Sequence, residues 1–318
     1  MNGAHPVLVE VERSGVVESR HRGVAVALDA EGQVVRALGP VTVPVFPRST
    51  VKPFQAVAML RHRLALEGEL LALAASSHSG ESFHVEGVAR ILATAGLTFE
   101  ALGCPPDWPL DAEAERALVR DGGEAGRRYM NCSGKHAAML ATCRENGWPI
   151  DSYLDTSHPL QRAVRETLEE FAGEHVAMVG VDGCGAPLFG LSPLALARAF
   201  HRLGKAAPDT PEGRVAAAMR AHPAWTSGTR RDEYDLMADV PGLIVKSGAE
   251  GVDAFCLPDG ASGIVKIDDG ASRARTPVTI ALLNLLGAAS PRLTHLSTTP
   301  ITGGPCVVGA IHPTPALR

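Results

Sequence analysis

The order of strand-like and helix-like segments constrains the fold of this chain more than any other feature of its sequence. Apolar runs separated by turn residues, a pattern typical of antiparallel hairpins, lie at 7–11, 16–19, 24–28 and 34–38. Further strand-like runs lie at 176–181, 243–246, 254–257 and 264–267. Strands therefore stand near both ends of the chain, without the steady strand–helix alternation of a doubly wound sheet.

Helical signals dominate from residue 49 to about residue 220. A hydroxyl residue with a nearby proline marks expected helix starts, at 157–159, 192–193, 210–211 and 276–277. Further helices are expected at 53–66, 84–95 and 135–146, and the stretch 104–128 is expected to be an exposed excursion. We predict a single domain over residues 1–318, of the α/β (α+β) class, with a mostly antiparallel sheet, flanking helices and a helix-rich insertion.

The composition fits a globular protein and excludes some functions. Hydrophobic residues make up 45% of the 318 residues, enough for a substantial core. The net charge of −5 offers no basic excess for nucleic acid or an anionic membrane surface. No apolar run is long enough to span a membrane. The start lacks the pattern of a signal peptide, and the six cysteines form no C-x-x-C pair, which predicts reduced thiols in the cytoplasm.

Ser49 and Lys52 form an S-x-x-K pair just before an apolar helical stretch. A serine hydroxyl needs a neighbouring base to act as a nucleophile at neutral pH, and residues three apart on a helix share a face. We therefore expect the Lys52 amine within reach of the Ser49 oxygen, at a helix N-terminus whose free N–H groups suit developing negative charge. Such a pair also occurs by chance, so the prediction depends on later segments.

Two later segments complete the pattern of a serine hydrolase. The run Ser76-Ser77-His78-Ser79 follows an apolar stretch, and Lys246-Ser247-Gly248 ends a strand-like run. A serine nucleophile with its lysine, a second serine and a K-[ST]-G strand form the functional set of serine β-lactamases and penicillin-binding proteins. The same order in this chain predicts nucleophilic catalysis.

Two cysteines stand where elements are expected to begin or end. Cys132 lies in N-C-S-G-K-H, which opens a helix, and Cys184 lies in D-G-C-G after a strand-like run. Polar, glycine-flanked positions of this kind are typical of functional sites. The alternative for each cysteine is a small buried core residue.

Five segments together resemble the asparaginase II family, the rhizobial-type L-asparaginases. They are PRSTVKPFQAVAML, ASSHSGE, NCSGKHAAML, VDGCGAP and VKSGAEG, and the resemblance runs from about residue 7 to about residue 305. It implies a serine β-lactamase/glutaminase-like fold and a homodimer. It also implies hydrolysis of the side-chain amide of L-asparagine to L-aspartate and ammonia, without an organic cofactor.

The resemblance also implies site residues. The catalytic set is two Ser–Lys pairs, Ser49 (the nucleophile) with Lys52 and Ser77 with Lys246. The residues that match positions near the substrate are Arg48, His136 and Asp182. The residues that match a cluster able to hold zinc in relatives are Cys132, Lys135 and Cys184. Because a lysine ligand must first lose its proton, we do not expect zinc at the centre of the chemistry.

The substrate itself sets two requirements, since asparagine carries a carboxylate and an ammonium group. Arg48 suits the carboxylate through bidentate hydrogen bonds, and Asp182 is a candidate for the ammonium. The alternatives are an Asx turn at Asp182-Gly183 and a solvated His136 at a helix start.

Other functions remain open at this point. A glutaminase or a β-lactamase-like hydrolase shares the Ser–Lys chemistry. In a cysteine hydrolase, Cys132 would be the nucleophile and His136 its base, although no third orienting residue stands out. The third class is a non-catalytic penicillin-binding-like, zinc-binding or amino-acid-binding protein.

Overall fold

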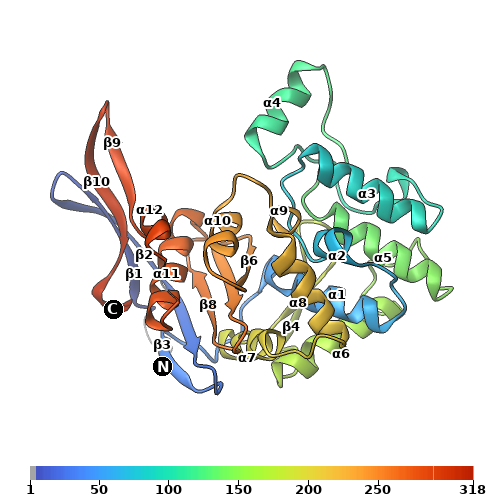
Figure 1. The fold of residues 1–318 in the computed structure, drawn as a ribbon, viewed down its shortest axis with the longest axis horizontal. Helices are drawn as coiled ribbons and strands as arrows, with labels where there is room; N and C mark the ends of the chain where they lie inside the picture. Colours follow the sequence, from blue (N-terminus) through green and yellow to red (C-terminus); the bar gives the residue numbers. More distant parts are fainter. Residues whose placement is uncertain (1–4, 289, 318) are drawn as a thin grey trace.

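A large sheet lies beside a group of helices in the computed structural model, which describes residues 5–288 and 290–317 (Figure 1). The strands of the chain are β1 (Val7–Arg13), β2 (Val16–Leu28), β3 (Val34–Leu38), β4 (Met178–Val181), β5 (Pro187–Gly190), β6 (Ile244–Gly248), β7 (Val252–Cys256), β8 (Ser262–Ile267), β9 (Thr299–Gly303) and β10 (Cys306–Pro313). The large sheet has the order β6-β7-β8-β2-β1-β10-β9, with β3 paired to β2, and β4 pairs with β5 separately.

The helices occupy mainly the middle of the chain. They are α1 (Lys52–Arg61), α2 (Gly68–Ala74), α3 (Ser82–Thr94), α4 (Ala112–Arg120), α5 (Ser133–Glu145), α6 (Pro159–Ala172), α7 (Pro193–Gly204), α8 (Pro211–Ala221), α9 (Pro223–Thr226), α10 (Asp232–Asp239), α11 (Ser272–Leu285) and α12 (Thr294–Ser297). Short 3₁₀ turns are η1 (Arg48–Val51), η2 (Phe99–Ala101), η3 (Pro291–Leu293) and η4 (Pro315–Leu317).

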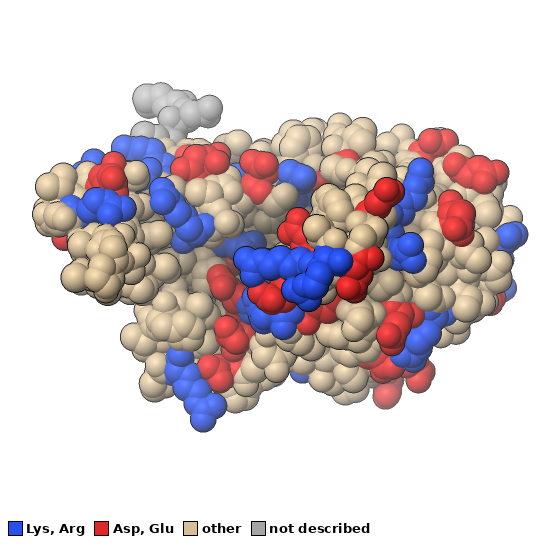
Figure 2. Space-filling model, turned by 90° about the horizontal axis from the view of Figure 1, so that it is seen from above, with Lys and Arg blue, Asp and Glu red and all other residues tan. Residues whose placement is uncertain are grey.

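The predicted fold class is confirmed. All strand pairings among the described residues are antiparallel, and helices flank the sheet and form a region of their own beside it (Figure 1). None of the helices in the described part of the chain has the length and apolar character that a membrane crossing requires. On the face drawn in Figure 2, Lys and Arg side chains lie among Asp and Glu side chains.

The strand β2 joins the two halves of the large sheet. Its first half pairs with β1, and its second half pairs with β8 on one side and β3 on the other. Gly23 stands where the partners change, and a Cβ there would lie 2.2 Å from the carbonyl oxygen of Lys266. A larger residue would push the two backbones apart. The separate runs predicted at 16–19 and 24–28 are therefore two parts of one long strand.

Alternate residues of the central strands face two different cores. In β6, Ile244 packs into the core of the helical region, whereas Val245 packs into the core beneath α11. Because side chains of a strand alternate between its faces, Lys246 points toward the same side as Ile244. The strand therefore directs the Lys246 amine toward the helical region.

The predicted helix start at Thr276-Pro277 was wrong. Helix α11 begins at Ser272, and Pro277 lies inside it. The Thr276 hydroxyl donates to Asp232 Oδ2 at 2.7 Å instead of capping a helix, and Arg275 in the first turn pairs with Glu233. Tertiary contacts thus stabilise an additional first turn of α11, which lies before the helix start that the local sequence signal indicated.

The stretch 104–128 also contains structure that the sequence reading did not anticipate. Helix α4 lies within it, and the Asp111 side chain caps the helix by accepting from the Ala114 N–H at 2.8 Å. No α4 residue is buried, and the helix projects from the top of the molecule in Figure 1. The predicted excursion is exposed but partly helical. The hairpin of β9 and β10 was not predicted.

Candidate active site

A cleft of about 470 Å³ opens between the helical region and the end of β6. The sequence-predicted residues that line it are Arg48, Ser49, Ser77, Cys132, Asp182 and Cys184. The remaining predicted residues do not line it and are almost fully buried: Lys52, Lys135, His136 and Lys246. The fold thus gathers segments from across the chain around one cavity.

Ser49 lies in the 3₁₀ turn η1, which leads directly into α1. Its neighbour Arg48 has a φ of 52°, in the left-handed region that non-glycine residues rarely adopt. Such strain costs about 1–3 kcal/mol and clusters at functional sites. Ser49 is half-buried, and its hydroxyl makes no hydrogen bond within residues 5–288 and 290–317.

Gly248 allows β6 to approach this turn closely. A Cβ at position 248 would lie 3.0 Å from the Pro47 carbonyl oxygen and 3.2 Å from the Ser49 nitrogen. These contacts are tighter than side chains normally make, so a larger residue would force β6 and η1 apart. The glycine of the Lys246-Ser247-Gly248 segment therefore has a steric role beside the Ser49 N–H.

The Ser77 hydroxyl lies between two lysine amines. Lys52 Nζ donates to Ser77 Oγ at 2.9 Å and to the Ser76 carbonyl at 2.7 Å. Lys246 Nζ donates to Ser77 Oγ at 2.9 Å and to the Ser247 carbonyl at 2.6 Å. The sequence suggested two separate Ser–Lys pairs, but here both lysines hydrogen-bond to Ser77.

The buried Lys246 amine lies close to the Lys52 amine, since both hydrogen-bond to Ser77 Oγ. Burial, and then the positive charge of Lys52, lowers the pKa of Lys246 well below its ordinary value of 10.5. A lowered pKa favours the deprotonated amine, and a deprotonated amine can accept a proton from a neighbouring hydroxyl. The arrangement thus places a candidate base in hydrogen-bond contact with Ser77.

Arg48 and Asp182 form an ion pair on the wall of the cleft. Arg48 Nε donates to Asp182 Oδ1 at 2.8 Å. Burial would raise the pKa of the Asp182 carboxyl, but the charges of Lys135 and Arg48 outweigh it and lower that pKa. The Asx turn predicted as an alternative is replaced by a backbone turn, in which the Gly185 N–H donates to the Asp182 carbonyl at 2.8 Å and the Asp182 side chain accepts from the adjacent Gly183 N–H at 2.9 Å. The cleft thus presents fixed groups of both signs.

The cysteines of the predicted cluster lie together with Lys135. Lys135 Nζ donates to Cys184 Sγ at 3.1 Å. Contact with Cys184 lowers the pKa of the Cys132 thiol well below its usual range, and the same contact raises the pKa of Cys184. Burial would lower the pKa of Lys135, but the two cysteines outweigh burial and raise it. Lys135 is therefore held as an ammonium ion.

This donor set does not fit a zinc ion as it stands. The two thiols suit zinc, but the third donor is a protonated amine that donates to one of them. Among the described residues, no group of three or more His, Cys, Asp or Glu side chains is placed to hold a metal. We derive no chemical step through zinc.

His136 lies beside Cys184 and does not line the cleft. It is fully buried, and its Nδ1 hydrogen-bonds to the Tyr153 hydroxyl at 2.6 Å. Burial, with the charge of Lys135, lowers the pKa of His136 to about 4. No hydrogen bond joins it to Cys132 within the described chain, so the Cys132–His136 pair of the cysteine-hydrolase alternative is not formed.

Two arginines of the cleft were missed by the sequence reading. Arg231 and Arg275 line it, and both bind the buried Glu233. Arg231 precedes α10, in a segment without a recognisable motif. Only the run of opposite charges in Arg230-Arg231-Asp232-Glu233 marks it in the sequence.

The fold and the cleft define the general class, a mixed α/β protein in which serine and lysine side chains gather beside one cleft. A family model described as L-asparaginase II matches residues 9–313, so the chain belongs to the L-asparaginase II family. This membership supports an amidohydrolase-type activity. No curated protein matches the chain in sequence.

Several solved structures match this chain at low overall similarity. A candidate β-lactamase from Bacteroides dorei DSM 17855 has a TM-score of 0.43 at 13% identity, covering 77% of this chain and 84% of that one. A simvastatin synthase mutant from Aspergillus terreus has a TM-score of 0.41 at 14% identity, covering 77% and 86%. The structure of Mglu in its tris and glutamate form has a TM-score of 0.35 at 17% identity. The match covers 92% of this chain and 63% of that one.

Proposed function

We propose that the chain hydrolyses the side-chain amide of L-asparagine to L-aspartate and ammonia. The family membership supports this reaction. The observation that carries the proposal is the Ser77 hydroxyl fixed between the amines of Lys52 and Lys246, beside a cleft that Ser49 lines. A relay of this kind moves protons to and from a serine nucleophile.

In the proposed reaction, Ser49 Oγ attacks the amide carbon and forms a tetrahedral intermediate. The Lys246 amine, neutral when it acts as the base, takes the serine proton. The Ser77 hydroxyl passes a proton onward to the departing nitrogen. The C–N bond breaks, ammonia leaves, and an ester to Ser49 remains. Water then attacks the ester carbon and gives one proton to the relay. The bond between the acyl carbon and Ser49 Oγ breaks, the relay returns the proton to Ser49 Oγ, and aspartate is released. Backbone N–H groups around η1 are the candidates to stabilise the oxyanion.

The Arg48–Asp182 pair suits the charged end of a free amino acid. Arg48 uses Nε toward Asp182 Oδ1, and one of its terminal nitrogens lies 3.9 Å from the exposed Glu250 carboxylate. The guanidinium has further N–H groups that can bind a carboxylate. The second oxygen of Asp182, which lies 3.8 Å from Cys184 Sγ, is the candidate partner of an ammonium group. The pair therefore favours a zwitterionic amino acid amide over a peptide or an uncharged amide.

Ammonia release from asparagine and glutamine tests the proposal, with wild type, Ser49→Ala and the neighbouring Thr50→Val as the matched control. Thr50 also carries a hydroxyl, but it is buried and donates to the Pro47 carbonyl. We expect wild type and Thr50→Val to release ammonia from asparagine and Ser49→Ala to be inactive. A chromogenic β-lactam in the same assay tests the β-lactamase-like alternative.

The possible outcomes separate the alternatives. A folded Ser49→Ala variant with retained turnover would show that Ser49 is not the nucleophile. A wild-type protein that binds asparagine without releasing ammonia would support the binding-protein alternative. Faster release from glutamine would make the protein a glutaminase. The homodimer and the cytoplasmic location remain predictions, and sedimentation and cell fractionation test them.

A further inference from the structure

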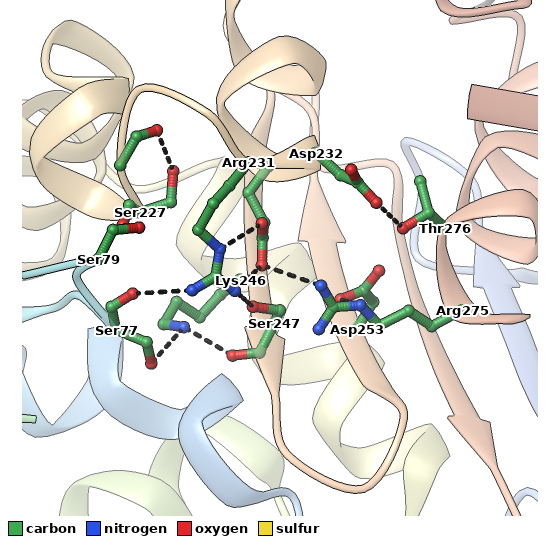
Figure 3. A network of polar contacts seen from close by, with 12 residues as sticks. Ser77, Ser79, Ser227, Arg231, Asp232, Lys246, Ser247, Asp253, Arg275 and Thr276 are labelled. Carbon is green, nitrogen blue, oxygen red and sulfur yellow. Dashed lines mark hydrogen bonds and ion pairs between the residues drawn. The ribbon is translucent and has the colours of Figure 1, made fainter. Parts of the chain in front are cut away.

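Arg231 spans the junction between the helical region and the sheet at the cleft floor. Its guanidinium lies 3.4 Å from the Ser77 carbonyl oxygen through one terminal nitrogen and 3.3 Å from Ser247 Oγ through the other. Figure 3 shows the side chain reaching between these two segments. Ser77 follows α2 and Ser247 belongs to β6, so one side chain hydrogen-bonds to both walls of the site.

The guanidinium is held from behind by a buried carboxylate. Arg231 Nε and a terminal nitrogen bind the two oxygens of Glu233 at 3.1 and 2.8 Å. Burial would raise the pKa of Glu233, but Arg231 and Arg275 outweigh it and hold that pKa well below its usual range. A bidentate pair of this kind fixes the plane of the guanidinium.

The same carboxylate continues the network into the core beneath α11. Arg275 binds Glu233 at 3.2 Å and approaches Asp253 within 3.5 Å. Asp253 in turn accepts from the Thr279 hydroxyl at 3.0 Å. Figure 3 draws this network from Arg231 to Arg275 and Asp253. Arg231 is therefore braced against α11 and β7, and it is placed more rigidly than an arginine at a cleft surface would be.

We propose that Arg231 is a positioning residue of this site: it holds the Ser77 segment against β6 so that the Ser77 hydroxyl stays between the two lysine amines. Only the expected change in kcat rests on the proposed function. The arrangement itself is open to measurement without any substrate.

The position of Arg231 also has an electrostatic consequence. The charged and titratable groups around the Lys246 amine are Lys52 from α1, Arg231 and Glu233 from the start of α10, and Cys132 from the start of α5. Arg231 and Lys52 oppose a charge on Lys246, whereas Glu233 and Cys132 favour it. Removing Arg231 also removes one of the cations that offset the negative charge of Glu233, so this charge acts more strongly on Lys246. Both changes should raise the pKa of Lys246.

The chain offers a direct readout because it contains only five lysines, Lys52, Lys135, Lys205, Lys246 and Lys266. Carbon-13 labelling of the lysine ε-carbons should give few NMR signals, and Lys246→Met assigns the one of interest. We expect the Lys246 titration midpoint of wild type to lie well below 10.5, and that of Arg231→Gln to move upward. The adjacent Arg230→Gln is the matched control, because Arg230 pairs with Asp111 instead.

Kinetics supply the second arm once wild type has been shown to release ammonia. We expect Arg231→Gln to lose roughly 100-fold in kcat with a smaller change in KM, since misplacing a catalytic group costs about that much. The acid limb of its pH–rate profile should move to higher pH. Arg231→Lys keeps the positive charge but cannot hydrogen-bond to Ser77 and Ser247 at the same time. It should therefore lower kcat, while the acid limb of its pH–rate profile stays near that of wild type.

The outcomes of the two arms are distinguishable. An unchanged Lys246 midpoint together with unchanged kcat in folded Arg231→Gln would overturn the proposal. If that variant fails to fold, an Arg231→Lys variant with wild-type kcat would overturn it equally. If wild type releases no ammonia, the proposed function fails. The shift of the Lys246 midpoint between wild type and Arg231→Gln then still decides whether Arg231 organises the lysine pair.

Discussion

Two buried lysines beside the same cleft have opposite electrostatic environments. Lys246 faces Lys52 and Arg231 as well as Glu233 and Cys132, and burial together with Lys52 lowers its pKa. Lys135 is equally buried, but it faces two cysteines and Asp182, and its pKa is raised. Burial opposes the charged form in both cases. The balance of neighbouring charges therefore decides in which lysine the ammonium form is disfavoured and in which it is retained.

The two lysines mark two sides of the cleft with different roles. The Lys246 side, with Lys52 and Ser77, holds the groups of the proposed proton relay. The Lys135 side stabilises negative charge on Cys132 and Asp182, and Asp182 in turn binds Arg48. Substitutions of the two lysines should therefore have different effects on activity and on stability.

The largest effect should follow from Lys246→Met. Removing a base that acts in proton transfer costs on the order of 10²–10⁴-fold in rate, and methionine keeps most of the aliphatic volume. We expect kcat for asparagine at neutral pH to fall by that factor while the protein stays folded. Steady-state ammonia release checks this, and a Lys246→Met enzyme with nearly normal kcat would remove Lys246 from the proton relay.

Lys135→Met should act mainly on stability. It removes the cation beside Cys132 and Asp182, and breaking a buried charge pair costs about 3–5 kcal/mol. We expect the free energy of unfolding to fall by roughly 3 kcal/mol, with a smaller loss of kcat than in Lys246→Met. Urea unfolding measures the change. Equal stability of the Lys135→Met and Lys246→Met variants would contradict the division of tasks.

The pH dependence of stability should also differ in sign between the two lysines. The folded Lys246 amine loses its proton at lower pH than in the unfolded chain, so between those pH values the unfolded chain binds more protons. Its contribution to stability therefore increases with pH up to about 10.5, by at most about 1.4 kcal/mol per pH unit. The raised pKa of Lys135 has the opposite consequence: its contribution is complete below 10.5 and is lost above that value.

Urea unfolding of wild type and Lys246→Met between pH 7 and pH 10 tests this sign. Wild type should gain stability relative to the variant as the pH rises, because the variant lacks the titrating amine. Parallel pH profiles for the two proteins would show that the Lys246 pKa is not lowered in the folded state.

The smallest effect should come from a metal chelator. Because Lys135 is held as a donor to Cys184, we expect chelation to change kcat far less than Lys246→Met does. Metal analysis before and after dialysis, with ammonia release measured on both samples, checks this. A loss of activity that added zinc restores would show that Lys135 gives up its proton to a metal.

Local signals predicted several elements well. Ser192 and Thr210 cap α7 and α8 as their hydroxyl-proline starts indicated, and β3 spans Val34–Leu38 as the apolar run suggested. These features depend on periodicity and on contacts within a few residues. The β9–β10 hairpin was missed because β10 is placed by pairing with β1, at the opposite end of the chain. No local pattern records such a pairing.

The sequence by itself determined which residue types were available for the chemistry: the Ser49–Lys52 spacing, the Ser77 segment, and a strand whose alternation turns Lys246 inward. Only the tertiary structure decided that both lysines would meet at Ser77, that Arg231 would hydrogen-bond to both the Ser77 and the Ser247 segments, and that Lys135 would keep its proton. The physical reason is that spacing and alternation are short-range properties of the backbone. Hydrogen bonds and pKa values depend on charges brought together through space, and Ser77 and Lys246 stand 169 residues apart in the chain.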